Sequence, residues 1–569
     1  MDIKNKTVLV LGGWGLVGSA ICRNMVEEGP KRIIVASLLK TEALDAVASL
    51  QKLFPKLGSK YFVPWWGNIF LRHELKDVPR KDLLGDGRTR QKLIDDLLDE
   101  LTMPVLQRSA LYKLLKAQAP DIVIDCVNSA TAIAYQDLFT SAREIRNNLK
   151  KSKKEQDAGL VEATERLLAT LYIPQLIRHV QILYRSMKEI GTEIYVKIGT
   201  SGTGGMGLNI PYTHSEERPS SVLLSKSSVA GAHTMLLFLM GRTPDAPITK
   251  EIKPAAAIAW KGIGFGEVRR GAQNIPLYDC PPERGVQLAG TLSLSPREGP
   301  WVSSNQSLRS VFIDTGENGI FSRGEFEAIS TPGQMEFVTP EEIAESVIYE
   351  IKGGNTGHDI INALDNATLN PTYRAGFLFQ RAKEEMKRLE EEHNINSVAF
   401  EFLGPPRLSK LLYEAHLLFL TYGTVKSVLR ASAEEMTSKL EALVRSNAKL
   451  RSEIISIGIP ILLSDGKTLL RGPRIKIPPY RGEGELPLTA KSLQTWTHEG
   501  WVDLRPANME RWKERFRSLI AEIDSIPYGE TSSRQLRNKV YWNNFGEIDP
   551  GKLVGWIFTV EEKGKRMKA

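Results

Sequence analysis

Residues Lys6–Met25 read KTVLVLGGWGLVGSAICRNM. An apolar run typical of a buried strand leads into a glycine-rich turn, and the turn leads into a segment of helical character. In the spacing G-x-x-G-x-x-G, Gly12 would permit a tight turn, Gly15 a close approach of the backbone, and Gly18 the packing of the helix on the strand. Backbone N–H groups at the positive end of such a helix can bind a diphosphate. The stretch therefore predicts dinucleotide binding, and a structural turn without a ligand is the alternative.

After this stretch, strand-like and amphipathic segments alternate along the chain as far as about Ile351. Further strands are expected at residues 32–37, 60–69, 121–131 and 191–202. This alternation is typical of βαβ units, so the sequence predicts an α/β protein with a Rossmann-type doubly wound parallel sheet and helical insertions. The charged insert at 72–108 is expected to form surface helices or oligomer contacts rather than catalytic parts.

The sequence changes character in its second half. Thr339, Pro340 and Glu342 have the spacing of a helix start in which Thr339 is the N-cap. Charged helical segments follow, and a Gly/Pro-rich stretch precedes a tryptophan-rich end, so helical and small α+β C-terminal additions are expected. The predicted domains are 1–365 for dinucleotide binding with substrate-side segments, 366–465 for a helical accessory region and 466–569 for an α+β extension. The tryptophans are expected to form the core of that extension, with stacking on a sugar or base as the alternative.

The composition, 42% hydrophobic and 25% charged, is that of a globular protein. The net charge of +8 comes from scattered basic residues, which are expected to be solvated surface, although an anionic ligand would also benefit from them. We expect no nucleic-acid partner. Because the apolar runs are too short to span a bilayer and the first strand follows the start without a signal segment, we expect a cytoplasmic protein without membrane contact. Three widely spaced cysteines predict reduced thiols, with neither a disulfide framework nor a metal site.

The end of the second expected strand bears on the choice of cofactor. A carboxylate at this place normally binds the ribose hydroxyls of the adenosine. Ser37 stands there instead, Lys40 follows, and the next acid is Glu42. A hydroxyl and an ammonium would accept a 2′-phosphate that a carboxylate would repel, so NADP is favoured over NAD.

Four segments together resemble the extended short-chain dehydrogenase/reductase family, which contains the nucleotide-sugar epimerases and dehydratases. They are VLGGWGLVGSAI at 10–21, WWGNI at 65–69, VIDCVNSAT at 123–131 and IPYTHSEERPSSVLLSKSS at 210–228. The family has an acid where this chain has Asn68, and its fourth-strand segment flanks the nicotinamide ribose. Together with Ser37 and Lys40, the resemblance implies cofactor contacts at Gly12, Gly13, Trp14, Gly15, Leu16, Val17, Gly18, Asn68, Ile69, Cys126, Asn128 and Lys226.

The family's chemistry uses a tyrosine as general acid/base for hydride transfer at a carbonyl or carbinol carbon, with a lysine four residues later on the same helical face. By position, Lys226 is that lysine. The hydroxyls expected to polarise the substrate oxygen are Ser201 and Thr203, with Thr200 beside them. Val222 stands in the place of the tyrosine and cannot transfer a proton.

Two functions therefore stay open. The first is an NAD(P)-dependent oxidoreductase or epimerase in which Tyr212, or else His214, supplies the proton, or in which the reaction needs little help from a phenol. Its substrate would carry a carbonyl or hydroxyl and be a nucleotide sugar or another anionic molecule, with Arg269 and Arg270 as possible anchors. The second is a non-catalytic NADP-binding sensor or scaffold that binds a partner through the C-terminal additions. The helical segments also predict a homodimer or a larger homo-oligomer.

Overall fold

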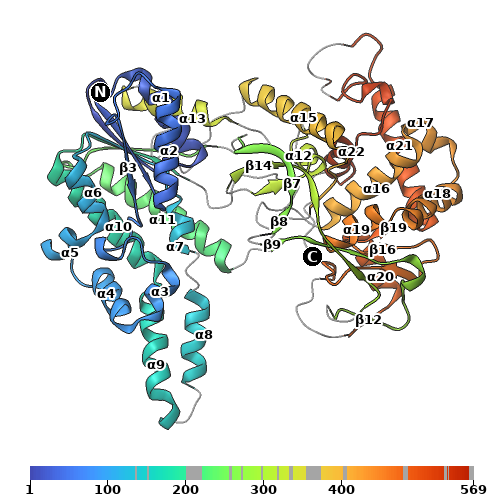
Figure 1. Cartoon of the computed structure of the whole chain (residues 1–569), viewed down its shortest axis with the longest axis horizontal. Helices are drawn as coiled ribbons and strands as arrows, with labels where there is room; N and C mark the ends of the chain where they lie inside the picture. The colour runs from blue at the N-terminus through green and yellow to red at the C-terminus, as the bar shows by residue number, and fades with distance from the viewer. Residues whose placement is uncertain are drawn as a thin grey trace. The chain divides into compact units, whose positions relative to one another are not determined.

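The computed structural model describes residues 1–134, 138–149, 153–199, 221–254, 259–270, 273–295, 299–316, 319–331, 338–353, 373–400, 406–478, 485–530, 535 and 537–562. They form two compact units. Unit 1 contains the described residues of 1–259 and 338–376, and unit 2 contains those of 260–331 and 377–562. Figure 1 colours the chain from its N-terminus to its C-terminus across both units.

Unit 1 contains a sheet of six parallel strands in the order β3-β2-β1-β4-β5-β6. The strands are β1 (Thr7–Leu11), β2 (Arg32–Ser37), β3 (Phe62–Trp66), β4 (Ile122–Asp125), β5 (Ile194–Ile198) and β6 (Ile248–Ile252). The strand order reverses between β1 and β4, and ligands of open α/β sheets bind at the carboxyl ends of the strands beside such a reversal. The predicted Rossmann-type doubly wound sheet is confirmed.

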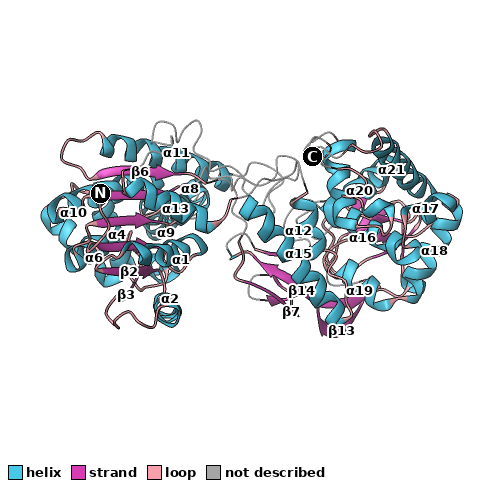
Figure 2. Cartoon of the chain, turned by 90° about the horizontal axis from the view of Figure 1, so that it is seen from above, coloured by secondary structure: helices cyan, strands magenta, loops and turns pink. Residues whose placement is uncertain are grey.

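Helices cover both faces of this sheet (Figure 2). They are α1 (Leu16–Met25), α2 (Lys40–Leu53), α3 (Arg80–Gly85), α4 (Gly87–Leu98), α5 (Met103–Arg108), α6 (Ala110–Gln118), α7 (Ser129–Ala134), α8 (Leu138–Asn148), α9 (Lys153–Leu168), α10 (Tyr172–Ile190), α11 (Ser221–Gly241) and α13 (Pro340–Ile351). Successive residues of a strand point to opposite faces. Val8 and Val10 accordingly lie in the core that includes α1, α2 and α13, while Leu9 and Leu11 lie in the core that includes α6, α10 and α11.

Unit 1 contains one local feature that was predicted and one strand that was not. Helix α13 begins as predicted, because the Thr339 hydroxyl accepts a hydrogen bond from the Glu342 N–H at 3.2 Å and the Glu342 carboxylate accepts one from the Thr339 N–H at 2.9 Å. Strand β6 was not expected. Its sequence ITKEI has three polar residues between two isoleucines and lies at the edge of the sheet, so it lacks the continuous apolar run by which the central strands were recognised.

Unit 2 combines short strands with helices. The strands are β7 (Gly262–Glu267), β8 (Arg269–Arg270), β9 (Gln273–Asn274), β10 (Pro276–Asp279), β11 (Val286–Gln287), β12 (Thr291–Ser293), β13 (Val302–Ser307), β14 (Arg309–Asp314), β15 (Ile320–Phe321), β16 (Ile461–Leu462), β17 (Thr468–Leu470), β18 (Glu485–Pro487) and β19 (Val502–Asp503). The helices are α12 (Arg323–Ile329), α15 (Tyr373–His393), α16 (Pro406–Tyr422), α17 (Val425–Arg430), α18 (Ala433–Ser446), α19 (Ala448–Ser456), α20 (Ala490–Glu499), α21 (Pro506–Asp524) and α22 (Pro550–Trp556). The expected helical and α+β C-terminal additions are present.

The boundary between the two units differs from the predicted domain division 1–365, 366–465 and 466–569. Residues 260–331 belong with the C-terminal half of the chain, because β11 pairs with β17 and β12 pairs with β18. Pairings between strands so far apart in the sequence leave no local signal, whereas the predicted division followed changes in composition.

Buried tryptophans form part of the core of unit 2, as expected. Trp501 and Trp512 are completely buried, and each indole N–H donates a hydrogen bond, from Trp501 to the Ile477 carbonyl at 2.7 Å and from Trp512 to Glu414 at 2.9 Å. The cysteines Cys22, Cys126 and Cys280 are free thiols, as predicted. In the described part of the chain, no helix is both long enough and apolar enough to span a membrane.

Candidate cofactor and catalytic site

The glycine turn between β1 and α1 is closely packed. Gly12 has a φ of +78°, in the left-handed region that favours glycine, and a Cβ on it would lie 3.2 Å from the Cys126 carbonyl carbon. A Cβ on Gly13 would lie 2.6 Å from Val35 Cγ1, and one on Gly18 would lie 2.9 Å from the Gly13 Cα. The backbone of the turn can therefore approach β2, β4 and α1 only because these residues have no side chain.

The start of α1 provides donors for an anion. Gly15 is the N-cap residue, no side chain in the described structure caps the helix, and no acid lies in its first turn. The first N–H groups of a helix, here those of Leu16, Val17 and Gly18, have no acceptor within the helix. These groups and the positive end of the helix dipole can bind a diphosphate, so the turn fits the dinucleotide that the sequence predicted.

The other residues that we expected to contact the adenosine lie at or shortly after the ends of β2 and β3. Ser37 is buried at the end of β2, and exposed Lys40, at the start of α2, has its ammonium 5.2 Å from the centre of the Trp66 ring. Asn68 closes the turn after β3, because its side-chain oxygen accepts a hydrogen bond from the Phe70 N–H at 2.9 Å. Ile69 beside it is buried.

A buried ion pair that the sequence reading missed joins the ends of β4 and β5. The Lys197 ammonium lies 3.1 Å from Asp125 and donates to the Val127 carbonyl at 2.5 Å, while the Tyr195 hydroxyl donates to Asp125 at 2.8 Å. Burial acts to raise the pKa of Asp125, but Lys197 and the hydrogen bonds outweigh it and hold that pKa below its usual value. The cluster fixes the backbone around Cys126, whose N–H donates to the Leu11 carbonyl at 2.9 Å.

Two buried histidines and a buried glutamate surround this ion pair. Burial lowers the pKa of His179 on α10 to about 4, and it lowers that of His233 on α11 well below the ordinary value. Their rings are 6.2 Å apart. Burial raises the pKa of Glu251 on β6. His233 is buried, and its Nε2 has no hydrogen-bond partner among the described residues.

Helix α11 carries Lys226, one of the residues expected to act in catalysis. Lys226 is buried in its second turn, and Val222 lies one turn before it. The Ser225 hydroxyl lies 2.9 Å from the hydroxyl of Tyr172, the first residue of α10. Tyr172 was not singled out from the sequence, because it belongs to no motif and lies 53 positions before its partner. The predicted Ser201, Thr203 and Tyr212, together with Thr200 and His214, fall outside the described residues.

The remaining predicted residues add less to the geometry of the site. Cys126 and Asn128 follow β4 at the carboxyl edge of the sheet, as the fourth-strand segment implied, and Trp14 lies in the glycine turn. Arg269 and Arg270 form the short strand β8 of unit 2, where the Arg269 side chain donates to Asn274 at 3.1 Å. Their role as anchors for an anionic substrate stays a prediction.

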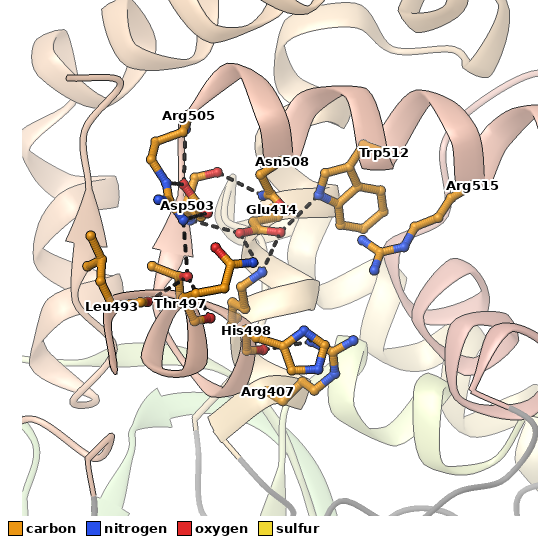
Figure 3. Close-up of polar contacts among 12 residues, drawn as sticks. Arg407, Glu414, Leu493, Thr497, His498, Asp503, Arg505, Asn508, Trp512 and Arg515 are labelled. Atoms are coloured by element: carbon orange, nitrogen blue, oxygen red, sulfur yellow. Dashed lines mark hydrogen bonds and ion pairs between the residues drawn. The ribbon is translucent and has the colours of Figure 1, made fainter. Parts of the chain in front are cut away.

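Unit 2 contains a second buried cluster of charges, shown in Figure 3. Glu414 on α16 is completely buried and accepts hydrogen bonds from the Asp503 N–H at 2.8 Å and the Trp512 indole at 2.9 Å, and it pairs with Lys410 at 2.9 Å. Arg407, one turn before Lys410, donates to Glu562 at 2.8 Å and to the His498 carbonyl at 2.6 Å. The donors and acceptors of this cluster bind one another, so we interpret the cluster as structural.

Comparison with known proteins adds a family for the larger part of unit 2. A search of curated proteins finds no match. Solved structures similar to the chain include Pen from Bacillus thuringiensis, at 11% identity over 46% of this chain and 54% of that one with a TM-score of 0.24. A short-chain type dehydrogenase/reductase from Mycobacterium ulcerans matches at 12% identity over 45% of this chain and 69% of that one, with a TM-score of 0.25. The UDP-Glc/GlcNAc 4-epimerase from Campylobacter jejuni matches at 13% identity over 44% of this chain and 53% of that one, with a TM-score of 0.22.

The chain thus spans about half the length of two of these structures. The sequence identities and TM-scores of these matches are too low to support a statement about activity. Residues 277–562, by contrast, match the family model of the beta-methylindole-3-pyruvate reductase C-terminal domain, and this range is just over half of the chain. The chain therefore belongs to the beta-methylindole-3-pyruvate reductase C-terminal domain family.

Proposed function

We propose that this protein is a nicotinamide-dinucleotide-dependent reductase that uses NADP in preference to NAD and acts on the keto group of an aromatic 2-oxo acid. In this proposal unit 1 is an atypical extended short-chain dehydrogenase/reductase domain. The observation that carries the proposal is the glycine turn at the switch point of a Rossmann sheet, where Cβ atoms on Gly12, Gly13 and Gly18 would meet neighbouring atoms closely and where the first N–H groups of α1 have no side-chain cap in the described structure.

The cofactor residues that we assign follow from this turn. The N–H groups of Leu16, Val17 and Gly18 would bind the diphosphate, and Lys40 would neutralise the 2′-phosphate that favours NADP. Lys226, buried in α11, would bind the nicotinamide ribose. When bound, the nicotinamide supplies hydride to a carbonyl carbon or accepts it from a carbinol carbon.

The substrate class comes from the family, whose name specifies an indole-bearing 2-oxo acid as the substrate of its reductase. Reduction of the keto group requires a proton at its oxygen, and Val222 cannot supply one. Tyr172 is the phenol that we assign to this role, because its hydroxyl is hydrogen-bonded to Ser225, one residue before Lys226 on α11. Tyr212 stays a second prediction.

The test mixes the 569-residue chain with NADPH or NADH and a series of 2-oxo acids that runs from pyruvate through phenylpyruvate to indole-3-pyruvate and its β-methyl derivative. NADPH absorbance should fall fastest with the aromatic acids. Tyr172→Phe should lower kcat by about 10²- to 10⁴-fold, the usual contribution of general acid catalysis, and leave the Kd for NADPH unchanged. An unchanged kcat in Tyr172→Phe would remove this residue from the mechanism.

A second candidate function has one observation in its favour. A non-catalytic NADP-binding sensor or scaffold would retain the glycine turn and lose the tyrosine, and Val222 stands at the tyrosine position. This candidate predicts that NADPH binds and that none of the oxo acids is reduced, so the same assay separates it from the reductase.

A further inference from the structure

Two tryptophans end β3, and their side chains lie on opposite faces of the sheet. Trp65 packs against the core that includes α6, α10 and α11. Because successive residues of a strand point to opposite faces, Trp66 points to the face that α2 covers. Trp66 pairs with Ser37 in the register of β3 and β2, so it lies beside the residue at which the adenosine ribose is expected.

The half-buried ring of Trp66 is in contact with two ammonium groups. Lys40 Nζ lies 5.2 Å and Lys76 Nζ lies 5.4 Å from the centre of the ring. Both distances are inside the limit of about 6 Å at which a cation is attracted to an aromatic face, and among the aromatic side chains tryptophan attracts a cation most strongly. The ring therefore holds both lysines at the carboxyl end of β3.

The two lysines differ in their other contacts. Lys76 donates to the Trp66 carbonyl at 2.9 Å and to the Asp77 carboxylate at 2.7 Å. Lys40 is exposed, and within the described part of the chain its ammonium pairs with no carboxylate. Glu42, the nearest acid along the chain, instead accepts a backbone hydrogen bond at the start of α2. Asp77 thus neutralises Lys76, whereas the charge of Lys40 can pair with an anionic ligand.

The contact with Trp66 restricts where the Lys40 charge lies. An ammonium on a flexible four-carbon chain normally samples many positions, and a ligand that fixes it must offset the lost side-chain entropy. The attraction to the ring limits this freedom before a ligand binds. Lys40 is held beside the strand end that carries Ser37, where the ribose of NADP would bear a phosphate and that of NAD a hydroxyl.

We propose that Trp66 is a positioning residue that holds the Lys40 ammonium for the 2′-phosphate of NADP. The inference rests on the proposed function, because it needs a dinucleotide whose adenosine lies at the ends of β2 and β3. It adds that the preference for NADP comes from a pair of side chains rather than from one charge. An exposed contact between a cation and an aromatic ring corresponds to about a two- to fivefold change in affinity, and we expect an effect of this size.

The experiment is a calorimetric titration of the 569-residue chain with adenosine 2′,5′-bisphosphate and with adenosine 5′-monophosphate, which differ only in the 2′-phosphate. The wild type should bind the bisphosphate more tightly. Trp66→Leu should lower the ratio of the two affinities about two- to fivefold, and Trp66→Phe, which keeps an aromatic face, should lower it less. Trp65→Leu is the matched control, because this ring lies on the other face of the sheet, and it should leave the ratio unchanged even if the melting temperature falls.

A double-mutant cycle separates positioning of Lys40 from a direct contact between Trp66 and the ligand. In the Lys40→Met background, which keeps an apolar chain without the charge, Trp66→Leu should no longer change the ratio. Trp66→Phe provides the same comparison if Trp66→Leu does not fold.

Three results would overturn the inference and leave the proposed reductase standing. They are equal affinities of the wild type for the two nucleotides, an unchanged ratio in Trp66→Leu, and an equal change of the ratio with and without Lys40. If NADPH and both nucleotides fail to bind to the wild type, the proposed function and the inference fail together.

Discussion

The glycine turn of unit 1 and the Glu414 cluster of unit 2 both gather polar groups, but the turn leaves helix donors without an acceptor in the helix, whereas the cluster pairs its charged groups with one another. At the turn, the first N–H groups of α1 have no side-chain cap in the described structure, and the glycines let the backbone pack closely on neighbouring residues. At Glu414, the carboxylate is surrounded by Lys410, the Asp503 N–H and the Trp512 indole (Figure 3). In the Glu414 cluster the charged groups pair with one another, whereas the helix N–H groups at the turn are donors to which an anionic ligand can bind.

We expect the largest effect on cofactor binding from a substitution that adds a side chain to the glycine turn. Gly18→Val places a branched side chain where even a Cβ would lie 2.9 Å from the Gly13 Cα, so α1 can no longer pack against the turn. We expect NADPH binding to fall below detection in calorimetry and the melting temperature to drop.

Gly231→Ala provides the control for this change. Gly231 lies within α11 with open space around its Cα, so alanine should stabilise the helix by up to about 1 kcal/mol and leave the Kd for NADPH unchanged. NADPH binding of wild-type strength in Gly18→Val would contradict the role of the turn.

Breaking the Glu414 cluster should affect stability without affecting the cofactor. In Glu414→Gln, buried Lys410 loses its carboxylate partner, and removal of one member of a buried ion pair costs about 3–5 kcal/mol. Urea denaturation should show this loss, while the Kd for NADPH stays the same.

Glu435→Gln is the matched control, because Glu435 and Lys439 have the same spacing on an exposed helix face with their charged groups 2.7 Å apart. It should cause no measurable loss of stability. A change in NADPH affinity in Glu414→Gln, or an equal destabilisation by the two variants, would remove the distinction between the closed cluster and the surface pair.

Acid should destabilise both units through buried histidines. Burial lowers the pKa of His179 in unit 1 and of His416 in unit 2 to about 4, whereas the unfolded chain has a value of about 6.5. The unfolded state therefore binds more protons in this range, so this contribution to the free energy of unfolding is complete above about pH 6.5 and falls as the pH decreases toward 4.

The histidine variants isolate this contribution. Burial raises the pKa of Glu327 and of Glu453 to about 7, and these carboxyls act in the opposite direction, so the total slope alone is not diagnostic. Between pH 7 and pH 5, the free energy of unfolding should decrease less in His179→Gln and in His416→Gln than in the wild type. Identical slopes in wild type and variants would show that neither histidine is held neutral.

The smallest effect concerns the choice of cofactor. Lys40→Glu puts a negative charge near the place assigned to the 2′-phosphate and should weaken NADPH binding about tenfold, or about 1.4 kcal/mol, without weakening NADH binding. Lys52→Glu, at the exposed end of the same helix, should leave both affinities unchanged. Equal losses for the two cofactors would place Lys40 away from the 2′-phosphate.

Much of unit 1 could be predicted from the sequence because its signals are local. The apolar run of β1, the glycines that follow it and the Thr339–Glu342 cap each lie within a few residues, and the structure has the strand, the turn and the cap in these places. The edge strand β6 lacks such a signal because three consecutive polar residues interrupt its apolar ones.

The parts that could not be predicted depend on contacts between distant residues. Asp125 meets Lys197, and Tyr172 meets Ser225, only after the sheet and its helices have assembled. The same holds for the pairing of β11 with β17, which assigns residues 260–331 to unit 2. A charged residue such as Glu414 looks like a surface residue in the sequence, and only the tertiary structure shows that its carboxylate is buried among hydrogen-bond and ion-pair partners.

We propose that the glycine turn of unit 1 is open to a dinucleotide, and the most direct test is a calorimetric titration of the 569-residue chain with NADPH and with NADH. We predict one NADPH site per chain with a micromolar Kd, and weaker binding of NADH at the same site. If neither cofactor binds at millimolar concentration, the turn is a structural element without a ligand, and the proposed dinucleotide site of unit 1 is wrong.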